Sequence, residues 1–394
     1  KIAKAKALGM HPTAYGAVYA ASKPFFEKHP TWAFYNSCQE PFVFIDVFYI
    51  MNIAEGSPWR KHLFEEYQSA ISMMGFSGIH MDTYGFPKTA YSHLDAIPKK
   101  IKLEDELPTL IDETRENVHG EEEPYLIFNN VGAWPVQRTA DRKQDAVYIE
   151  VWPPYDRYAS IAQLIRDART YAKDDKSIIL AAYLKPFREG KREKALPAAK
   201  LLMGSIVSNG ATHLLTGENQ TALTQGYYSD YTKFSDSEAE AIRRYYDYMI
   251  RYENLFFDPE LQDVTMTHTG WDNYEYQCTS HKVSSYGEAG KIWMILREKD
   301  YRKCIYLLNL CGQSEDYWNE GKEEPIIQKD IKFTVQVDTP VEKICFSTPD
   351  GKSMDAVELL FTERATRTGK FIDFTVPSLN YWTTIWIDTR KETI

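Results

Sequence analysis

Two carboxylates in this sequence follow short apolar runs, at points where a buried strand would end in an exposed loop. Asp82 comes after residues 78–81, and Glu150 comes after residues 146–149. At the carboxyl edge of a parallel α/β sheet or barrel, such residues are placed for chemistry. Paired carboxylates with aromatic neighbours are typical of glycosidases, in which one attacks the sugar and the other transfers a proton.

Each carboxylate also has an ordinary structural interpretation. An aspartate after a strand often caps a helix or forms a turn. A glutamate within a strand can be an ion-pair partner. The pattern of two such carboxylates, with Tyr148 and Trp152 close to Glu150 in the sequence, favours catalysis more than either residue does alone.

The composition excludes several kinds of partner. A net charge of −10 without a long basic run argues against a nucleic-acid partner, because phosphate binding needs clustered Lys and Arg. The 5 cysteines show no CxxC spacing, which argues against a zinc ribbon or a thioredoxin motif. No stretch is long and apolar enough to span a membrane. Aromatic residues make up 14% of the chain, which suits either sugar stacking or aromatic β-sheet surfaces.

The first 258 residues alternate between strand and helix patterns. This alternation predicts βαβ units around a parallel sheet, and the continuously apolar strands predict burial on both faces. We expect strands at 13–21, 42–50, 125–130, 177–183 and 212–218 and in the runs that hold Asp82 and Glu150. We expect helices at 59–74, 107–118, 161–172, 195–208 and 237–252.

Seven strands are one short of a TIM (β/α)8 barrel. The segment 1–10 has the pattern of a helix end that is capped by Gly9. We therefore expect the first barrel strand to lie upstream of residue 1. In this interpretation residues 1–258 form an N-terminally incomplete catalytic TIM-barrel domain, and Asp46 is a hydrogen-bonded residue inside the barrel or a supporting residue of the site.

The pattern changes beyond residue 263. Short runs of alternating polarity are separated by Gly, Asp, Asn and Pro, and helical periodicity is absent. Such runs predict an all-β domain. We expect residues 263–394 to form a C-terminal antiparallel β-sandwich.

Five segments, in this order, resemble glycoside hydrolase family 66, the bacterial dextranases and cycloisomaltooligosaccharide glucanotransferases. They are Gly-Phe-Ser-Gly-Ile-His-Met-Asp-Thr-Tyr-Gly (75–85), Phe-Asn-Asn-Val (128–131), Tyr-Ile-Glu-Val-Trp-Pro-Pro (148–154), Ala-Ala-Tyr (181–183) and Gly-Glu (217–218). The resemblance runs through most of residues 1–255. It implies a TIM barrel with a C-terminal β-sandwich. It also implies an immunoglobulin-like domain and the first barrel strand before residue 1.

The resemblance implies that Asp82 is the nucleophile and Glu150 the general acid/base. A retaining enzyme needs one ionised carboxylate and one that carries a proton. We expect Tyr148 and Trp152 to keep Glu150 protonated through burial, and His80 and Asn130 to donate hydrogen bonds to Asp82. The resemblance implies no metal or organic cofactor.

The remaining predicted site residues would bind substrate. Asn130 ends a strand and could bond a sugar hydroxyl, whereas Asn129 would cap the turn. Tyr15 and Trp152 could stack on sugar rings or pack within the barrel. Of His80 and Asp82, one is expected to face inward. Glu218 ends the last strand and could bond a sugar hydroxyl or pair with a basic residue.

Within the family, the glucanotransferases carry a carbohydrate-binding module late in the barrel, and residues 183–212 leave no room for one. We therefore predict a dextranase, an endo-acting hydrolase of α-1,6-glucan. The alternatives are a cycloisomaltooligosaccharide glucanotransferase, a hydrolase of another glucan, and a non-catalytic glucan-binding relative. We expect a secreted or cell-surface bacterial monomer whose partner is α-1,6-glucan or an isomaltooligosaccharide.

Overall fold

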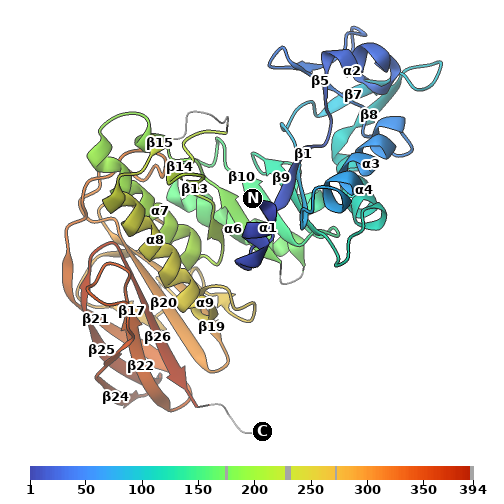
Figure 1. Cartoon of the computed structure of the whole chain (residues 1–394). Coiled ribbons are helices and arrows are strands. Elements are labelled where there is room, and N and C mark those ends of the chain that lie inside the picture. The colour runs from blue at the N-terminus through green and yellow to red at the C-terminus, as the bar shows by residue number, and fades with distance from the viewer. Residues whose placement is uncertain (174–175, 227–231, 271–272, 391–394) are drawn as a thin grey trace. The chain divides into compact units, whose positions relative to one another are not determined.

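The computed structural model describes residues 1–173, 176–226, 232–270 and 273–390. The chain packs as two compact units, which are described separately below (Figure 1). Unit 1 consists of residues 1–152 and 167–179, and unit 2 of residues 153–166 and 180–394. The predicted domain boundary near residues 258–263 stays a prediction.

Unit 1 is built on a parallel sheet. Its strands are β1 (Thr13–Ala17), β6 (Gly78–Asp82), β9 (Tyr125–Val131) and β10 (Ala146–Glu150), which pair in this order and in parallel. The order continues with β11 (Ser177–Ala181), which is shared with unit 2, and then β12 (Thr212–His213). All five residues of β10 are buried, as expected for a strand that is covered on both faces.

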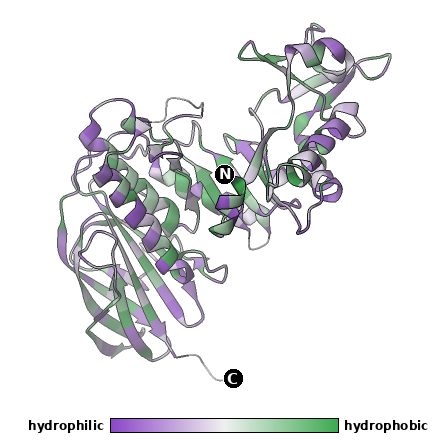
Figure 2. Ribbon diagram, in the orientation of Figure 1, coloured by the Kyte–Doolittle hydropathy of each residue, from purple (hydrophilic) through white to green (hydrophobic). Residues whose placement is uncertain are grey.

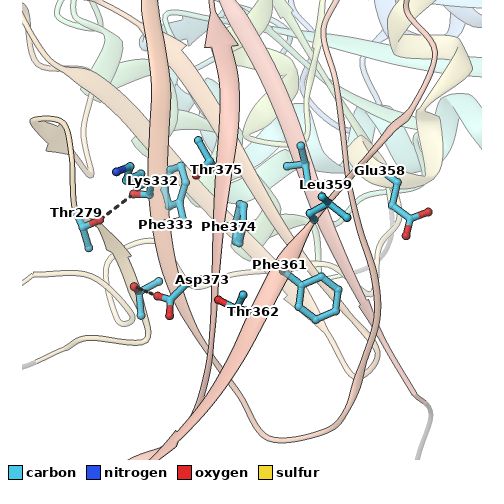
Figure 3. Close-up of a pocket in the computed structure, with 12 residues that line it drawn as sticks. Thr279, Lys332, Phe333, Glu358, Leu359, Phe361, Thr362, Asp373, Phe374 and Thr375 are labelled. Carbon is cyan, nitrogen blue, oxygen red and sulfur yellow. Dashed lines mark hydrogen bonds between the residues drawn. The ribbon is translucent and has the colours of Figure 1, made fainter.

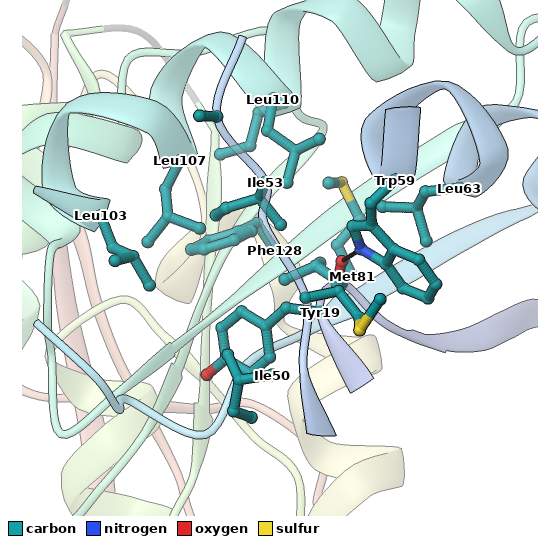
Figure 4. Packing of buried hydrophobic residues seen from close by; sticks show 14 of the residues in the cluster. Tyr19, Ile50, Ile53, Trp59, Leu63, Met81, Leu103, Leu107, Leu110 and Phe128 are labelled. Carbon is teal, nitrogen blue, oxygen red and sulfur yellow. Dashed lines mark hydrogen bonds between the residues drawn. The ribbon is translucent and has the colours of Figure 1, made fainter. Parts of the chain in front are cut away.

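Helices cover one face of this sheet. Figure 4 shows Met81 of β6 and Phe128 of β9 packed in one cluster with residues from two helices, α3 (Pro58–Ser72) and α4 (Leu103–Asn117). Because side chains alternate along a strand, Ile79 and Leu126 point the same way and belong to the same cluster. Burying each of the larger side chains contributes roughly 1.5–3 kcal/mol, so this face anchors the strands.

The sequence also explains where these helices begin. Ser57 precedes α3, and its hydroxyl accepts a hydrogen bond from the Arg60 amide, as an N-cap residue does. Helix α4 carries three acidic residues in its first turn, where negative charge interacts favourably with the helix dipole. The first helix, α1 (Ile2–Ala7), ends before Gly9, whose φ of 78° agrees with the predicted cap.

The segment between β1 and α3 corrects one prediction. Residues 42–50 do not form a barrel strand; they form a hairpin of β4 (Val43–Phe44) and β5 (Phe48–Ile50). This hairpin pairs with β2 (Ala20–Ser22) in a small sheet of its own. Asp46 is exposed at the turn, with a φ of 59°, so the barrel-interior role predicted for it is wrong.

A second small sheet and several short helices complete unit 1. The sheet contains β3 (Phe34–Tyr35), β7 (Thr89–Ser92) and β8 (Lys99–Lys102). The helices are α2 (Lys23–Lys28), η1 (Pro30–Trp32) and α5 (Val136–Thr139). Helix α6 (Tyr158–Ala172) runs across the division between the two units.

Unit 2 contains helices and sheets. After η2 (Lys185–Phe187) and η3 (Arg192–Lys194) come α7 (Ala195–Ser208), α8 (Asp236–Arg251) and α9 (Glu253–Phe256). Helix α8 begins with a capping box formed by Ser235 and Glu238. Figure 2 shows hydrophobic and hydrophilic residues on different sides of α8, whose buried residues include Ile242, Tyr245 and Tyr248. A small antiparallel sheet joins β13 (Thr216–Gly217), β14 (Thr221–Ala222) and β15 (Thr232–Lys233).

Two larger sheets form the C-terminal part of unit 2. The first contains β16 (Gln262–Asp263), β18 (Val283–Ser284), β19 (Ile292–Lys299), β20 (Arg302–Asn309), β22 (Val341–Ser347), β23 (Val357–Leu359) and β26 (Trp382–Thr389). The second contains β17 (Tyr276–Cys278), β21 (Gln328–Val337), β24 (Phe361–Thr366) and β25 (Gly369–Leu379). Their buried residues, such as Ile305 and Phe333, belong to one hydrophobic cluster.

The predicted mixture of a parallel sheet and a later region of antiparallel sheets is confirmed. The parallel sheet has six strands rather than the expected seven, because residues 42–50 lie outside it. Among the described residues its strand order runs from β1 to β12, and the closed TIM barrel stays a prediction. In the described part of the chain, no helix is both long enough and apolar enough to cross a membrane.

Candidate active site

The sheet of unit 1 has one polar face. Parallel pairing places Tyr15 beside His80 and Asn129 beside Tyr148. Met81 pairs with Phe128, and one residue further along these strands the Asn129 amide donates to the Asp82 carboxylate at 2.7 Å. Because paired residues point to the same face and side chains alternate along each strand, one face carries Tyr15, His80, Asp82, Asn129, Tyr148 and Glu150. The opposite face is the one that packs against α3 and α4.

The two predicted catalytic carboxylates lie close together at the ends of their strands. Asp82 and Glu150 are only 8% and 9% exposed. A single nitrogen, Nδ2 of Asn129, donates to Asp82 Oδ1 at 2.7 Å and to Glu150 Oε2 at 3.1 Å. Asp82 Oδ1 and Glu150 Oε2 are therefore separated by no more than the sum of these two distances. That limit suits the roughly 5–5.5 Å of retaining glycosidases better than the roughly 6.5–9.5 Å of inverting ones.

Asp82 accepts a second hydrogen bond from Tyr15. The Tyr15 hydroxyl donates to Asp82 Oδ2, so each oxygen of this carboxylate has its own donor. Two donors of this kind stabilise negative charge and hold the carboxylate in one orientation. The Tyr15 side chain is 65% exposed, which leaves most of it accessible beside Asp82.

The backbone around both carboxylates is also held in place. The Val18 amide donates to the Asp82 carbonyl at 2.9 Å, and the Gly132 amide donates to the Glu150 carbonyl at 2.9 Å. The Thr83 hydroxyl donates to the carbonyl of Asn129 at 3.1 Å. These bonds fix the strand ends, so the carboxylates are carried by rigid elements rather than by loops.

His80 lies on the polar face together with Asp82. Its ring packs edge-on against Tyr148, with ring centroids 4.7 Å apart. Burial lowers the pKa of the His80 imidazole, although the Asp82 carboxylate opposes that effect. The donors to Asp82 are Tyr15 and Asn129, rather than His80 and Asn130 as the sequence analysis expected.

Asn130 points away from the carboxylates. Its Nδ2 donates to the Tyr148 carbonyl at 2.9 Å, and its Oδ1 accepts from the Thr139 hydroxyl at 2.6 Å. The physical reason is the alternation of side chains, which puts Asn130 on the same face as the buried Phe128. The sequence analysis did not assign Asn129 to the site. The alternation of side chains was the available signal: the apolar Phe128 points to the core, so its neighbour Asn129 points to the opposite face.

Two further predicted residues lie outside the strands. Trp152 follows β10 by two residues and is 37% exposed, so part of its ring is accessible near the end of that strand.

Glu218 belongs to unit 2, where it is exposed at the turn between β13 and β14. Its carbonyl accepts a hydrogen bond from the Thr221 hydroxyl at 2.7 Å. Glu218 therefore ends a short antiparallel strand rather than the last strand of the parallel sheet.

Neighbouring tyrosines stay protonated. Burial raises the pKa of Tyr19 and Tyr67 far above the ordinary range, and the negative charge of Asp82 adds to this effect. The Tyr19 hydroxyl accepts a hydrogen bond from the Tyr84 amide, just beyond Asp82. Among the described residues, no group of three or more His, Cys, Asp or Glu side chains is arranged to hold a metal ion.

A hollow on unit 2 offers no comparable chemistry. The hollow has a volume of about 590 Å³ and is lined by residues of β21, β23, β24 and β25 together with Thr279 and Leu360. Figure 3 shows these side chains, Asp373 among them. Its Asp373 carboxylate accepts from Thr334 and from Arg364, whose Nε lies 2.9 Å away. Asp373 is thus paired with a guanidinium.

Comparison with known families identifies the family of this chain. The family model for Glycosyl hydrolase family 66 matches residues 1–386. The chain belongs to glycosyl hydrolase family 66. The resemblance inferred from the sequence motifs is therefore confirmed, and the family consists of glycoside hydrolases and glucanotransferases.

Two cycloisomaltooligosaccharide glucanotransferases of Niallia circulans resemble this family 66 chain. One is 28% identical over 193 residues, which cover 48% of this chain and 19% of the relative. The other is 26% identical over 191 residues, with the same 48% and 19% coverage. The alignment therefore spans only a small part of each relative.

Solved structures show the same fold. A crystal structure of a cycloisomaltooligosaccharide glucanotransferase from Paenibacillus sp., complexed with cycloisomaltoheptaose, matches with a TM-score of 0.84 at 17% identity. That match covers 95% of this chain and 72% of the other. A noncanonic maltogenic α-amylase from Thermotoga neapolitana matches with a TM-score of 0.57 at 10% identity, covering 99% of this chain and 80% of the other.

Proposed function

We propose that this family 66 chain carries the active site of a retaining enzyme that cleaves α-1,6-glucan, with Asp82 as nucleophile and Glu150 as general acid/base. The observation that supports this most is the shared amide of Asn129, because it holds the two carboxylates at a distance suited to double displacement. The donors on both oxygens of Asp82 fit a residue that must attack as an anion.

In the first step, Glu150 gives its proton to the glycosidic oxygen while an oxygen of Asp82 attacks the anomeric carbon. The bond between that carbon and the leaving oxygen breaks, and a glycosyl ester of Asp82 forms. In the second step, the Glu150 carboxylate takes a proton from water, which attacks the same carbon and releases Asp82. If a sugar hydroxyl replaces water, the same chemistry transfers or cyclises the chain.

For the activity itself, we propose a dextranase that hydrolyses dextran internally to isomaltooligosaccharides. Residues 182–211, between β11 and β12, contain η2, η3 and α7 and are described throughout. They leave no space for an inserted binding module, which favours the hydrolytic branch. The second candidate, a cycloisomaltooligosaccharide glucanotransferase, is favoured by the names of the relatives.

Substrate contacts follow from the polar face. We propose that Tyr15, His80 and Trp152 contact the sugars near Asp82 and Glu150, because Tyr15 and His80 share the face of the carboxylates and Trp152 follows β10. Glu218 stays a proposed contact to a sugar hydroxyl. We also propose that the parallel sheet is part of a TIM barrel followed by a β-sandwich, and that the protein is a monomer. A secreted or cell-surface location fits its large extracellular substrate.

Digestion of dextran tests these proposals together. The wild-type chain should release linear isomaltooligosaccharides, and Asp82→Ala and Glu150→Gln should both abolish their release. Cyclic products that vanish in the same variants would select the glucanotransferase. Dextran that is bound but not cleaved by the wild-type chain would contradict both candidates and select a non-catalytic glucan-binding protein.

A further inference from the structure

The Asn129 amide has an unusual set of partners. Its NH₂ group has two hydrogens, and the structure directs one to Asp82 Oδ1 and the other to Glu150 Oε2. The side chain is only 4% exposed, and it comes from β9, which lies between the strands that carry Asp82 and Glu150. Asn129 therefore has little freedom to turn toward other partners.

The oxygen of the same amide has no hydrogen-bond donor among the described residues. No donor from the described residues reaches Oδ1 of Asn129, although this atom is buried. A buried acceptor without a partner is unfavourable, and native structures rarely contain one. Reversing the amide would place its oxygen against the ionised carboxylate of Asp82, which is worse because an acceptor then faces an acceptor. The charge on Asp82 therefore sets the orientation of the amide.

We propose that Asn129 is a positioning residue that couples the protonation of Glu150 to the charge on Asp82. This inference rests on the proposed function. The N–H that points to Glu150 Oε2 needs an acceptor, and in a carboxylic acid the carbonyl oxygen accepts better than the hydroxyl oxygen. Asn129 therefore selects Oε2 as the carbonyl oxygen and leaves the proton on Oε1.

The coupling lasts through the reaction. Before the first step Asp82 carries one negative charge and Glu150 is neutral. After it, the Asp82 oxygen is bonded to the anomeric carbon as a neutral ester, and Glu150 has lost its proton to the leaving oxygen. The pair thus keeps one negative charge, which moves from one acceptor of Asn129 to the other. A single fixed amide can stabilise the anion in both states without reorganising.

Replacing Asn129 by aspartate tests this coupling directly. Asn129→Asp has nearly the same shape, removes the N–H donor and adds a further negative charge beside the pair. Because like charges disfavour ionisation, both limbs of the pH profile of kcat/KM on isomaltooligosaccharides should move to higher pH, by about one unit or more. At the wild-type optimum, kcat/KM should fall by about 100-fold or more.

Asn130→Asp is the matched control. It makes the same chemical change one residue along the strand, on the face opposite the carboxylates. It should lower stability and leave the limbs of the profile in place. If Asn129→Asp folds and loses activity while both limbs stay at the wild-type pH, Asn129 is a structural spacer and the inference is overturned.

A second readout does not depend on turnover. Titration of ¹³C-labelled Asp and Glu carboxyl groups by NMR should show coupled signals that move to higher pH in Asn129→Asp but not in Asn130→Asp. Carboxyl titrations that are identical in wild type and Asn129→Asp would also overturn the inference. If the wild-type chain cleaves no glucan, the proposed function fails, and this titration still decides whether Asn129 couples the two groups.

Discussion

Asn129 and Asn130 are consecutive residues of β9 whose amides serve opposite faces of the sheet. Asn129 reaches Asp82 and Glu150, whereas Asn130 bonds the Tyr148 carbonyl and the Thr139 hydroxyl. One asparagine is therefore part of the candidate active site, and the other ties β9 to β10 and α5. This division of roles can be tested by replacing each residue separately.

Asn130→Ala should destabilise the protein and spare catalysis. The change removes the buried hydrogen bonds that Asn130 makes to the Tyr148 carbonyl and the Thr139 hydroxyl, which costs about 1–3 kcal/mol. Urea unfolding measures that loss, and steady-state kinetics of the folded fraction should give kcat and KM near the wild-type values. A raised KM at unchanged stability would instead mean that Asn130 contacts the sugar, as the sequence first suggested.

Tyr15→Phe should lower the reaction rate without lowering stability. The ring is 65% exposed, but its hydroxyl donates to Asp82. Hydrogen bonds to charged groups contribute about 1.5–3 kcal/mol, so kcat/KM should fall by roughly 10- to 100-fold. Steady-state kinetics and thermal unfolding check the two effects.

Comparison with Tyr15→Ala separates the two roles of this residue. If the hydroxyl matters, Tyr15→Phe and Tyr15→Ala should both be impaired. If Tyr15 acts only as a platform for a sugar ring, Tyr15→Phe should behave like the wild type and only Tyr15→Ala should lose activity.

The turn of the β4–β5 hairpin is strained, and relieving the strain should stabilise the protein. Its central residues Ile45 and Asp46 have φ values of 47° and 59°, and the Val47 amide donates to the Phe44 carbonyl. A β-branched residue rarely adopts positive φ, and turns of this kind prefer Asn-Gly. The double variant Ile45→Asn/Asp46→Gly should gain about 1 kcal/mol in chemical unfolding. A loss of stability would mean that the apolar side chain of Ile45 packs usefully.

The hairpin also shows where sequence reasoning failed. Residues 42–50 are almost continuously apolar, which is how a strand buried on both faces appears. The segment contains neither glycine nor asparagine, the residues that most often predict a turn. Asp46 is the only charged residue in it. The φ values that the turn requires are imposed by surrounding contacts, such as Phe44 stacked on Tyr84 with ring centroids 4.2 Å apart. Local patterns do not contain that information.

Other elements were predictable because their signals are local. Helix α7 spans Ala195–Ser208 as expected from its apolar periodicity, and β6, β9 and β10 lie at the predicted runs. The positions of Asp82 and Glu150 at strand ends followed from the same runs. The shared amide of Asn129 did not, because it depends on the register between three strands that are far apart in the sequence.

The stability of unit 2 should fall in mild acid because of His213. Burial lowers the pKa of this imidazole to about 4, although its hydrogen bond to the Ala182 carbonyl opposes the shift. The unfolded chain binds the proton near pH 6.5, so between these values the unfolded state holds more protons. Stability from this source is complete above about pH 6.5 and is lost as the pH falls toward 4, by on the order of 3 kcal/mol.

His213→Gln isolates this contribution. Glutamine can still donate to the Ala182 carbonyl but does not titrate. Denaturant unfolding at several pH values should show a smaller loss of stability in the variant than in the wild type between pH 6.5 and 4. Equal losses in both proteins would show that His213 is not the group responsible.

The most direct test of the central claim is to trap the covalent intermediate. A fluorinated isomaltosyl fluoride should react with the wild-type chain, and peptide mass spectrometry should find the sugar on Asp82. Glu150→Gln should still accept the label, since the fluoride leaves without a proton, and Asp82→Ala should not. Label on Glu150, or cleavage of isomaltooligosaccharides with inversion at the anomeric carbon and no label at all, would contradict the assignment of Asp82 as nucleophile.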